Sequence, residues 1–354
     1  MEARPGNGRQ GDGGKKRRDR AGRGVRPRAG RAERGPRVRR RWRALLALLV
    51  TAAVVVPLTA AVRPRVPAPP PAALGPLTAA TLERAYAANR ANAALAARMA
   101  ADHGDRRRAA TDRALAAPGS RLLRFDGRGP GRAAEVLGDL AHARRVAVLV
   151  PGSDTSLDTY DRFHTAAAAL HRELARRAPA DTPTGVVAWL GYATPGTVST
   201  AAVTPDRADE AAPELREFVR LLRHVTGPHT RLSLLCHSYG SVVCGRAAPG
   251  LDVTDLVLLG SPGTGVDRAR ELRTRARIWA GRGADDWVAE VPHVEVRLPG
   301  ATVGFGRDPM TDAFGARVFD AGDGGHSDCF RPGSVCLANL ARIVLGTTGE
   351  AGRD

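Results

Sequence analysis

Residues 232–243 read Leu-Ser-Leu-Leu-Cys-His-Ser-Tyr-Gly-Ser-Val-Val, and this stretch decides how the rest of the chain is interpreted. The apolar run Leu232–Leu235 predicts a buried strand, and the small residues from Ser241 to Ala248 predict a helix. Between them Ser238 stands at the apex of a sharp turn. Gly240 would let the strand and the helix pack closely, because it has no side chain to separate them. The turn would therefore lift the Ser238 hydroxyl clear of the sheet.

Outside this stretch, short apolar runs alternate with amphipathic segments from about Arg121 onward. Alternating strands and helices predict an α/β fold, with a mostly parallel sheet and helices on both faces. Ligands of such a sheet lie beyond the carboxyl ends of its strands. Besides the strand at 232–235, we expect strands at Arg121–Phe125, Val146–Val150, Val186–Leu190, Leu256–Leu259, Ala276–Ala280 and Val294–Leu298, and helices at Arg132–His142, Tyr160–Ala178, Ala208–Val225 and Val335–Leu345.

Four motifs together resemble an uncharacterised actinobacterial family of α/β-hydrolases. They are Cys236-His237-Ser238-Tyr239-Gly240, Val187-Ala188-Trp189-Leu190-Gly191-Tyr192, Gly260-Ser261-Pro262-Gly263 and Gly306-Arg307-Asp308-Pro309. The first is similar to the nucleophile elbow G-x-S-x-G, with cysteine in place of the first glycine. The resemblance covers about Arg121 to Leu345. It implies the α/β-hydrolase fold over residues 118–347 and a Ser-Asp-His set in that chain order.

The N-terminal part of the chain has a different composition. Residues 1–43 hold 17 Lys/Arg and 4 Asp/Glu, a net charge of +13 out of the chain's +18, so the remaining 311 residues carry only +5. This predicts a disordered basic tail beside a membrane. We do not expect nucleic-acid binding, because the tail has no aromatic residue before Trp42 and adjoins an apolar run.

That apolar run, Ala44–Val62, has 19 residues without a charge. As a helix it would be roughly 28 Å long, close to the thickness of a bilayer core. It predicts either a membrane anchor, which we favour, or a signal peptide cleaved near Thr59–Ala61. Both interpretations place the folded part outside the cytoplasm, at the cell membrane or secreted. A proline-rich extended linker at 63–77 and a helical segment at 78–117, interrupted at Gly104, are expected next.

The four cysteines favour an oxidising compartment mildly. Cys329 and Cys336 lie seven residues apart in a loop and form a reasonable disulfide. Cys236 and Cys244 flank Ser238, and either pair or remain buried thiols. We expect no metal site, since no CxxC or HxxxH spacing occurs.

A serine hydroxyl becomes a strong nucleophile when a nearby base removes its proton, and histidine suits this role. Only His293 and His326 follow Ser238. His326 lies in the glycine-rich loop 322–328, just before the last expected helix, and is our candidate base. His293, beside an expected strand, looks structural. His237 is interpreted as a packing or pocket residue, because adjacent side chains at an elbow point apart.

A carboxylate must orient the histidine. We expect it after the strand at 276–280, which leads into Gly281-Arg282-Gly283-Ala284-Asp285-Asp286-Trp287-Val288. Asp286 is the first choice and Asp285 the second. Asp308 is a rival whose other interpretation is an Asp-Pro turn. Asp323 and Asp328 are interpreted as solvated loop residues.

The tetrahedral intermediate of such a reaction needs backbone N–H donors. One is expected from Tyr239. Another is expected from the loop after the strand at 146–150, where Gly152 and Ser153 stand. These residues predict a serine hydrolase that cleaves carboxylic esters, lipid-like or small, with no cofactor. The alternative is an inactive α/β-hydrolase-like binding or scaffold protein of the cell envelope.

Overall fold

The computed structural model describes residues 66–299 and 301–348. The predicted basic tail at 1–43 and the predicted anchor or signal at 44–62 lie outside the described residues. Within the described ranges, no helix is both long enough and apolar enough to span a bilayer.

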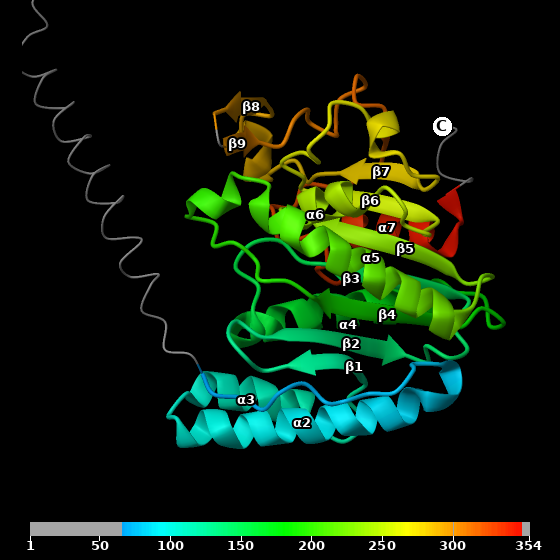
Figure 1. Ribbon diagram of the computed structural model, residues 1–354. Coiled ribbons are helices and arrows are strands. Elements are labelled where there is room, and N and C mark those ends of the chain that lie inside the picture. The colour runs from blue at the N-terminus through cyan, green and yellow to red at the C-terminus, as the bar shows by residue number, and fades with distance from the viewer. Residues whose placement is uncertain (1–65, 300, 349–354) are drawn as a thin grey trace, which may run out of the picture. The chain divides into compact units, whose positions relative to one another are not determined.

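Strands and helices alternate along most of the described chain (Figure 1). The helices are α2 Leu82–Asp102, α3 Arg106–Leu115, α4 Tyr160–Arg177, α5 Asp206–Thr226, α6 Gly240–Ala247 and α7 Val335–Leu345. The strands are β1 Leu122–Asp126, β2 Arg132–Gly138, β3 Arg145–Val150, β4 Thr184–Leu190, β5 Arg231–His237, β6 Asp255–Leu259, β7 Arg277–Gly281, β8 Glu295–Leu298, β9 Ala301–Gly304 and β10 Arg317–Val318.

The main sheet has the strand order β1-β2-β4-β3-β5-β6-β7-β10. Strand β2 runs antiparallel to both of its neighbours, and every other pair in this sheet is parallel. Strands β3 and β5 are adjacent, with Val150 paired with Cys236 at their carboxyl ends. The loop that follows β3 therefore begins beside the turn that carries Ser238.

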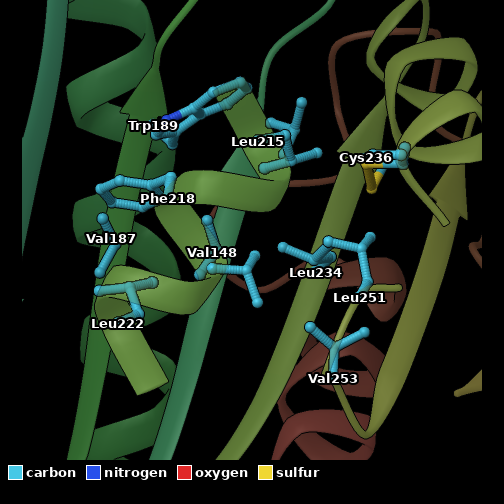
Figure 2. Close-up of a cluster of buried hydrophobic side chains, with 14 of the residues drawn as sticks. Val148, Val187, Trp189, Leu215, Phe218, Leu222, Leu234, Cys236, Leu251 and Val253 are labelled. Atoms are coloured by element: carbon cyan, nitrogen blue, oxygen red, sulfur yellow. A yellow bond between two sulfur atoms is a disulfide. The ribbon is translucent and has the colours of Figure 1, made fainter. Parts of the chain in front are cut away.

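Successive side chains of the central strands enter opposite layers of the core, because the side-chain period of a strand is two residues. Val146, Val148 and Val150 of β3 pack with α5 and α6, whereas Ala147 and Leu149 pack with α4 and α7. Figure 2 shows the first layer, in which Leu215, Phe218 and Leu222 of α5 face Val148, Val187 and Trp189 of the sheet. The predicted parallel sheet with helices on both faces is confirmed.

One predicted element was wrong. Residues 132–142 were expected to form a helix, but Arg132–Gly138 is strand β2, paired on both sides with β1 and β4. Alanine and glutamate favour a helix locally, yet the sheet buries both faces of this segment. Glu135 is buried, and its carboxylate accepts hydrogen bonds from Tyr160 Oη at 3.2 Å and His164 Nδ1 at 2.9 Å. Tertiary pairing thus overrides local propensity here.

The helical segment before the sheet forms two helices, with the predicted break at Gly104. Helix α2 packs along β1, the edge strand (Figure 1), and Asn89 Nδ2 donates to the Leu122 carbonyl at 2.8 Å. The preceding residues 66–77 have neither helix nor strand, but they are not a free linker. Asn92 Nδ2 donates to Pro70 O at 2.8 Å, and Leu77 is buried in the core.

Candidate active site

Ser238 stands at the turn between β5 and α6, in a left-handed backbone conformation with φ of +54°. This conformation is unfavourable for a residue with a side chain, and such strain persists where the surrounding structure enforces it. Here the Ser238 amide donates to Leu259 O of the neighbouring strand at 2.8 Å. A Cβ on Gly240 would lie 2.6 Å from Val150 O, so only glycine fits where the elbow meets β3.

The cysteine that replaces the first glycine of the elbow motif is disulfide-bonded. Cys236, at the end of β5, bonds to Cys244 on α6, and both are completely buried. A second disulfide joins Cys329, three residues after His326, to Cys336 on α7. The expected pairing of Cys329 with Cys336 is present, and the open question about Cys236 and Cys244 is resolved in favour of pairing. The elbow and the histidine loop are thus each tied covalently to a helix.

His326 and Asp286 are brought together from loops 40 residues apart. The Nδ1 atom of His326 lies 2.9 Å from Asp286 Oδ1, and it must donate because a carboxylate accepts. Asp286 is 4% exposed, and the same oxygen accepts the Val288 amide at 2.9 Å. With Nδ1 donating, the other ring nitrogen, Nε2, carries the lone pair that can accept a proton.

The other residues considered as acid or base lie elsewhere. Asp285 is exposed, and the carboxylate that pairs with His326 is that of Asp286. Asp308 pairs with Arg282 at 2.9 Å and accepts the Met310 amide at 3.0 Å, the pattern of an Asp-Pro turn. His293 lies near Asp308, with 3.8 Å between Nε2 and Oδ1. The structure therefore separates these three residues from the His326–Asp286 pair.

Electrostatics favour the charged form of Asp286. Burial by itself would raise the pKa of this carboxyl group. The hydrogen bonds from His326 and the Val288 amide, together with the charge of His326, outweigh burial, and the pKa lies below its usual value. Burial and the nearby charge of His326 lower the pKa of His237 to about 4. His237 is therefore neutral near pH 7, while Asp286 is ionised.

The loop after β3 approaches Ser238 very closely. A Cβ on Gly152 would lie 2.6 Å from Ser238 Cβ and 3.2 Å from its Oγ, so a glycine is required there. Asp154, in a left-handed conformation with φ of +57°, accepts the Thr197 amide at 3.1 Å and donates its own amide to Pro195 O at 3.0 Å. These bonds fix the loop, so the backbone of Gly152 and Ser153 is held beside the elbow.

His237 has a larger part in the site than the sequence indicated. It lines the cavity, as expected, but its Nε2 also donates to the His326 carbonyl at 2.7 Å. The two imidazole rings are 4.6 Å apart, and the indole of Trp287 lies 4.9 Å from His326 on another side. His326 is thus held by its backbone, by Asp286 and by two rings.

Two glycines, which the sequence motifs contained without indicating a role for either, complete the support of the pair. A Cβ on Gly260, at the end of β6, would lie 2.6 Å from Asp286 Oδ2 and 2.9 Å from His326 Nδ1. A Cβ on Gly283 would lie 1.8 Å from Gly324 O, so the acid loop and the histidine loop touch backbone to backbone. Asp328, interpreted as solvated, accepts the Gly325 amide at 2.9 Å and orders the histidine loop. The sequence signal for Gly260 was its place at the start of the Gly260-Ser261-Pro262-Gly263 motif, directly after a predicted strand.

A cavity of about 790 Å³ opens above Ser238, within the size range of small-molecule sites. Ser238, His326, Gly152, Ser153 and Tyr239 all line it. Its walls come from loops beyond the carboxyl ends of β3, β5, β6 and β7, where a parallel sheet is expected to bind ligands. Across the described ranges, no group of three or more His, Cys, Asp or Glu side chains could hold a metal ion.

Comparison with known proteins agrees with this architecture. A family model described as an alpha/beta hydrolase matches residues 126–296. An uncharacterized protein of Mycobacterium tuberculosis is 32% identical over 250 residues, covering 62% of this chain and 37% of the relative. Another, of Mycobacterium bovis, is 33% identical over 176 residues, covering 47% of this chain and 66% of the relative. The chain thus spans 37% of the length of the first of these relatives.

Two solved structures also resemble the chain. XC6422 from Xanthomonas campestris, described as a serine hydrolase without lid, has 18% identity, a TM-score of 0.38 and coverage of 66% of this chain and 95% of its own. Est1E from Butyrivibrio proteoclasticus has 12% identity, a TM-score of 0.37 and coverage of 66% and 98%.

The strand order, the elbow and the family match define the class of this protein, which has the α/β-hydrolase fold. Within that class it resembles an uncharacterised actinobacterial family, represented by the mycobacterial relatives.

Proposed function

We propose that the protein is a serine hydrolase that cleaves carboxylic esters through an acyl-enzyme on Ser238. The observation that carries this proposal is the hydrogen bond from His326 Nδ1 to the buried carboxylate of Asp286, because His326 lines the same cavity as the strained Ser238. A buried carboxylate that orients a histidine beside a serine is the arrangement that activates a hydroxyl for attack.

In the proposed reaction, Nε2 of His326 removes the proton from Ser238 Oγ as the oxygen attacks the ester carbonyl carbon. Asp286 keeps the imidazole in the correct tautomer and stabilises its positive charge. The oxyanion would accept hydrogen bonds from the backbone N–H groups of Ser153 and Tyr239. His326 then returns the proton to the departing alcohol. A water molecule, activated by the same histidine, releases the acid and restores Ser238.

The test uses purified residues 64–354, kept oxidised, with Ser238→Ala as the matched variant. A fluorophosphonate probe should label the wild type at Ser238 alone, as located by mass spectrometry. Esters should be hydrolysed by the wild type, and at least about 10³-fold more slowly by Ser238→Ala. A folded wild type that neither takes the label nor cleaves any ester would contradict the proposal and favour the inactive binding protein. Equal turnover by Ser238→Ala would exclude Ser238 as the nucleophile.

We also propose that the folded part works outside the cytoplasm. The support is the basic segment followed by the apolar run at 44–62, together with two disulfides, which persist in oxidising compartments. Protease added to intact cells should cleave or release the domain. Full protection of the domain until the cells are lysed would contradict this location.

A further inference from the structure

Exposed apolar side chains gather around the cavity. Eight large apolar residues are well exposed in the described part of the chain. Four of them line the cavity that contains Ser238, namely Val203, Trp287, Val294 and Val296, with exposed fractions between 48% and 55%. Exposed apolar groups gathered at one site rather than scattered singly indicate a surface that contacts a ligand or partner.

Most of this surface belongs to a hairpin separate from the main sheet (Figure 1). Strands β8 and β9 pair only with each other, and Val296 lies opposite Val303. Cross-strand partners project from the same face of a hairpin, and Val294 is two residues from Val296, so the three valines share that face. All three line the cavity. A two-stranded sheet is marginal by itself, so a ligand packed against this face would also stabilise the hairpin.

The apolar wall is continuous with the catalytic elbow. Phe305, directly after β9, is 5% exposed, and its ring meets the Tyr239 ring edge to face at 5.6 Å. The Phe305 carbonyl accepts the Thr264 and Gly265 amides at 3.0 and 2.8 Å. The Gly304 amide donates to Val203 O at 2.8 Å, joining the hairpin to the 200–203 turn. Apolar side chains thus continue from Tyr239, next to Ser238, through Phe305 to the valines of the hairpin.

Another part of the cavity lining carries polar side chains. They are Asp154, Thr155, Thr159 and Arg162, from the loop after β3 and the beginning of α4, which also contributes Phe163 and Ala166. The valine face, in contrast, offers no side-chain hydrogen-bond partner. An aliphatic chain gains by leaving water for the valine face, and a hydroxylated alcohol retains hydrogen-bond partners beside Arg162 and Thr159.

We infer that Val203 and the valine face of the β8–β9 hairpin form an acyl-chain subsite, so that the substrates are esters of medium- to long-chain aliphatic acids. This inference rests on the proposed function, because the acyl group must be attached to Ser238. The subsite selects the acid part of the ester by the length of the aliphatic chain that leaves water on binding. The alcohol part lies toward Arg162, Thr155 and Thr159.

The experiment measures kcat/KM for p-nitrophenyl esters from acetate to dodecanoate, kept monomeric. Each methylene added should raise kcat/KM by about fourfold until the valine face is covered, since burying a methylene favours binding by roughly that factor. Val296→Ser should flatten this dependence and lower dodecanoate turnover by about tenfold relative to acetate. Val318→Ser is the matched control, because Val318 is 50% exposed on β10 and does not line the cavity.

Val203→Ser provides a second test outside the hairpin, in case Val296→Ser disturbs the fold of β8 and β9. Comparing kcat/KM for hexyl acetate and ethyl hexanoate then shows which part of the ester contacts the valine face. The six-carbon chain belongs to the alcohol in hexyl acetate and to the acid in ethyl hexanoate. Equal kcat/KM from acetate to dodecanoate, or a preference for hexyl acetate, would overturn the subsite while leaving the proposed function intact. Failure of the proposed function is distinct, since then no ester is cleaved and Ser238 takes no fluorophosphonate.

Discussion

Gly260 offers the sharpest test of how the histidine and the acid are held. It follows β6 with φ of +50°, and its amide donates to Gly281 O at 3.0 Å. In Gly260→Ala the new methyl group would lie 2.6 Å from Asp286 Oδ2, 2.9 Å from His326 Nδ1 and 3.0 Å from His326 Cε1. The added carbon would therefore press directly on the hydrogen-bonded pair.

The magnitude follows from these distances. Ordinary contacts to a Cβ begin at 3.4 Å, so the carboxylate must move by about 0.8 Å, the difference between 3.4 and 2.6 Å. Misplacing a catalytic group by about 1 Å costs roughly 10²-fold in rate. We therefore expect kcat to fall about 10²-fold. Alanine at positive φ costs a further 1–2 kcal/mol or so of stability, whatever its surroundings.

Gly250→Ala separates these two effects. Gly250 has φ of +86°, and a Cβ there would meet nothing within 4 Å. In urea unfolding, both variants should lose about 1–2 kcal/mol for alanine at positive φ, and Gly260→Ala should lose more, because its methyl group also displaces packed side chains. Only Gly260→Ala should lose turnover of a p-nitrophenyl ester. Wild-type kcat in Gly260→Ala would refute the reasoning, and so would an equal loss of activity in Gly250→Ala.

Two further predictions concern the charges of the site. Asp286→Asn should lower kcat by about 10⁴-fold, because asparagine favours the wrong tautomer of His326. The controls Asp285→Asn and Asp308→Asn should keep a kcat within about threefold of wild type. A loss of about 10⁴-fold in either control would instead assign the acid to that residue. Because the folded pKa of His237 is about 4, below its unfolded value, the unfolded chain binds more protons as the pH falls from about 6.5 to 4. Unfolding free energy should therefore drop by roughly 3 kcal/mol over that window in wild type. The drop should be smaller in His237→Gln, and an equal drop in both proteins, measured by urea unfolding, would contradict the lowered pKa.

Local patterns in the sequence predicted most elements of the fold. The elbow strand is a continuous apolar run that is buried on both faces. The helices at 160–178, 208–225 and 335–345 repeat apolar residues at helical spacing, so burial can be inferred from the residues themselves. Strand β2 was the exception. Its alanines and Glu135 indicate a helix locally, and only pairing with β1 and β4 makes it a strand.

For the candidate site, the sequence selected Ser238, His326 and Asp286 by type and order, but it could not choose between Asp285 and Asp286. The side chains of neighbouring loop residues point in different directions, and the direction of each depends on how the loop packs against the rest of the protein. The structure buries Asp286 against His326 and leaves Asp285 exposed. The role of His237 in holding the His326 carbonyl likewise needed the tertiary structure, since the two residues are 89 positions apart.

The sequence by itself thus determined the class of fold, and it selected the candidate nucleophile and the residue types of the candidate site. Only the tertiary structure decided which acid bonds to the histidine, that both cysteine pairs are joined, and that the β8–β9 hairpin and the loop after β3 line one cavity. The physical reason is range. Burial periodicity and turn chemistry act over a few neighbouring residues, whereas a cavity and a hydrogen-bonded pair depend on how distant loops meet once the sheet has formed.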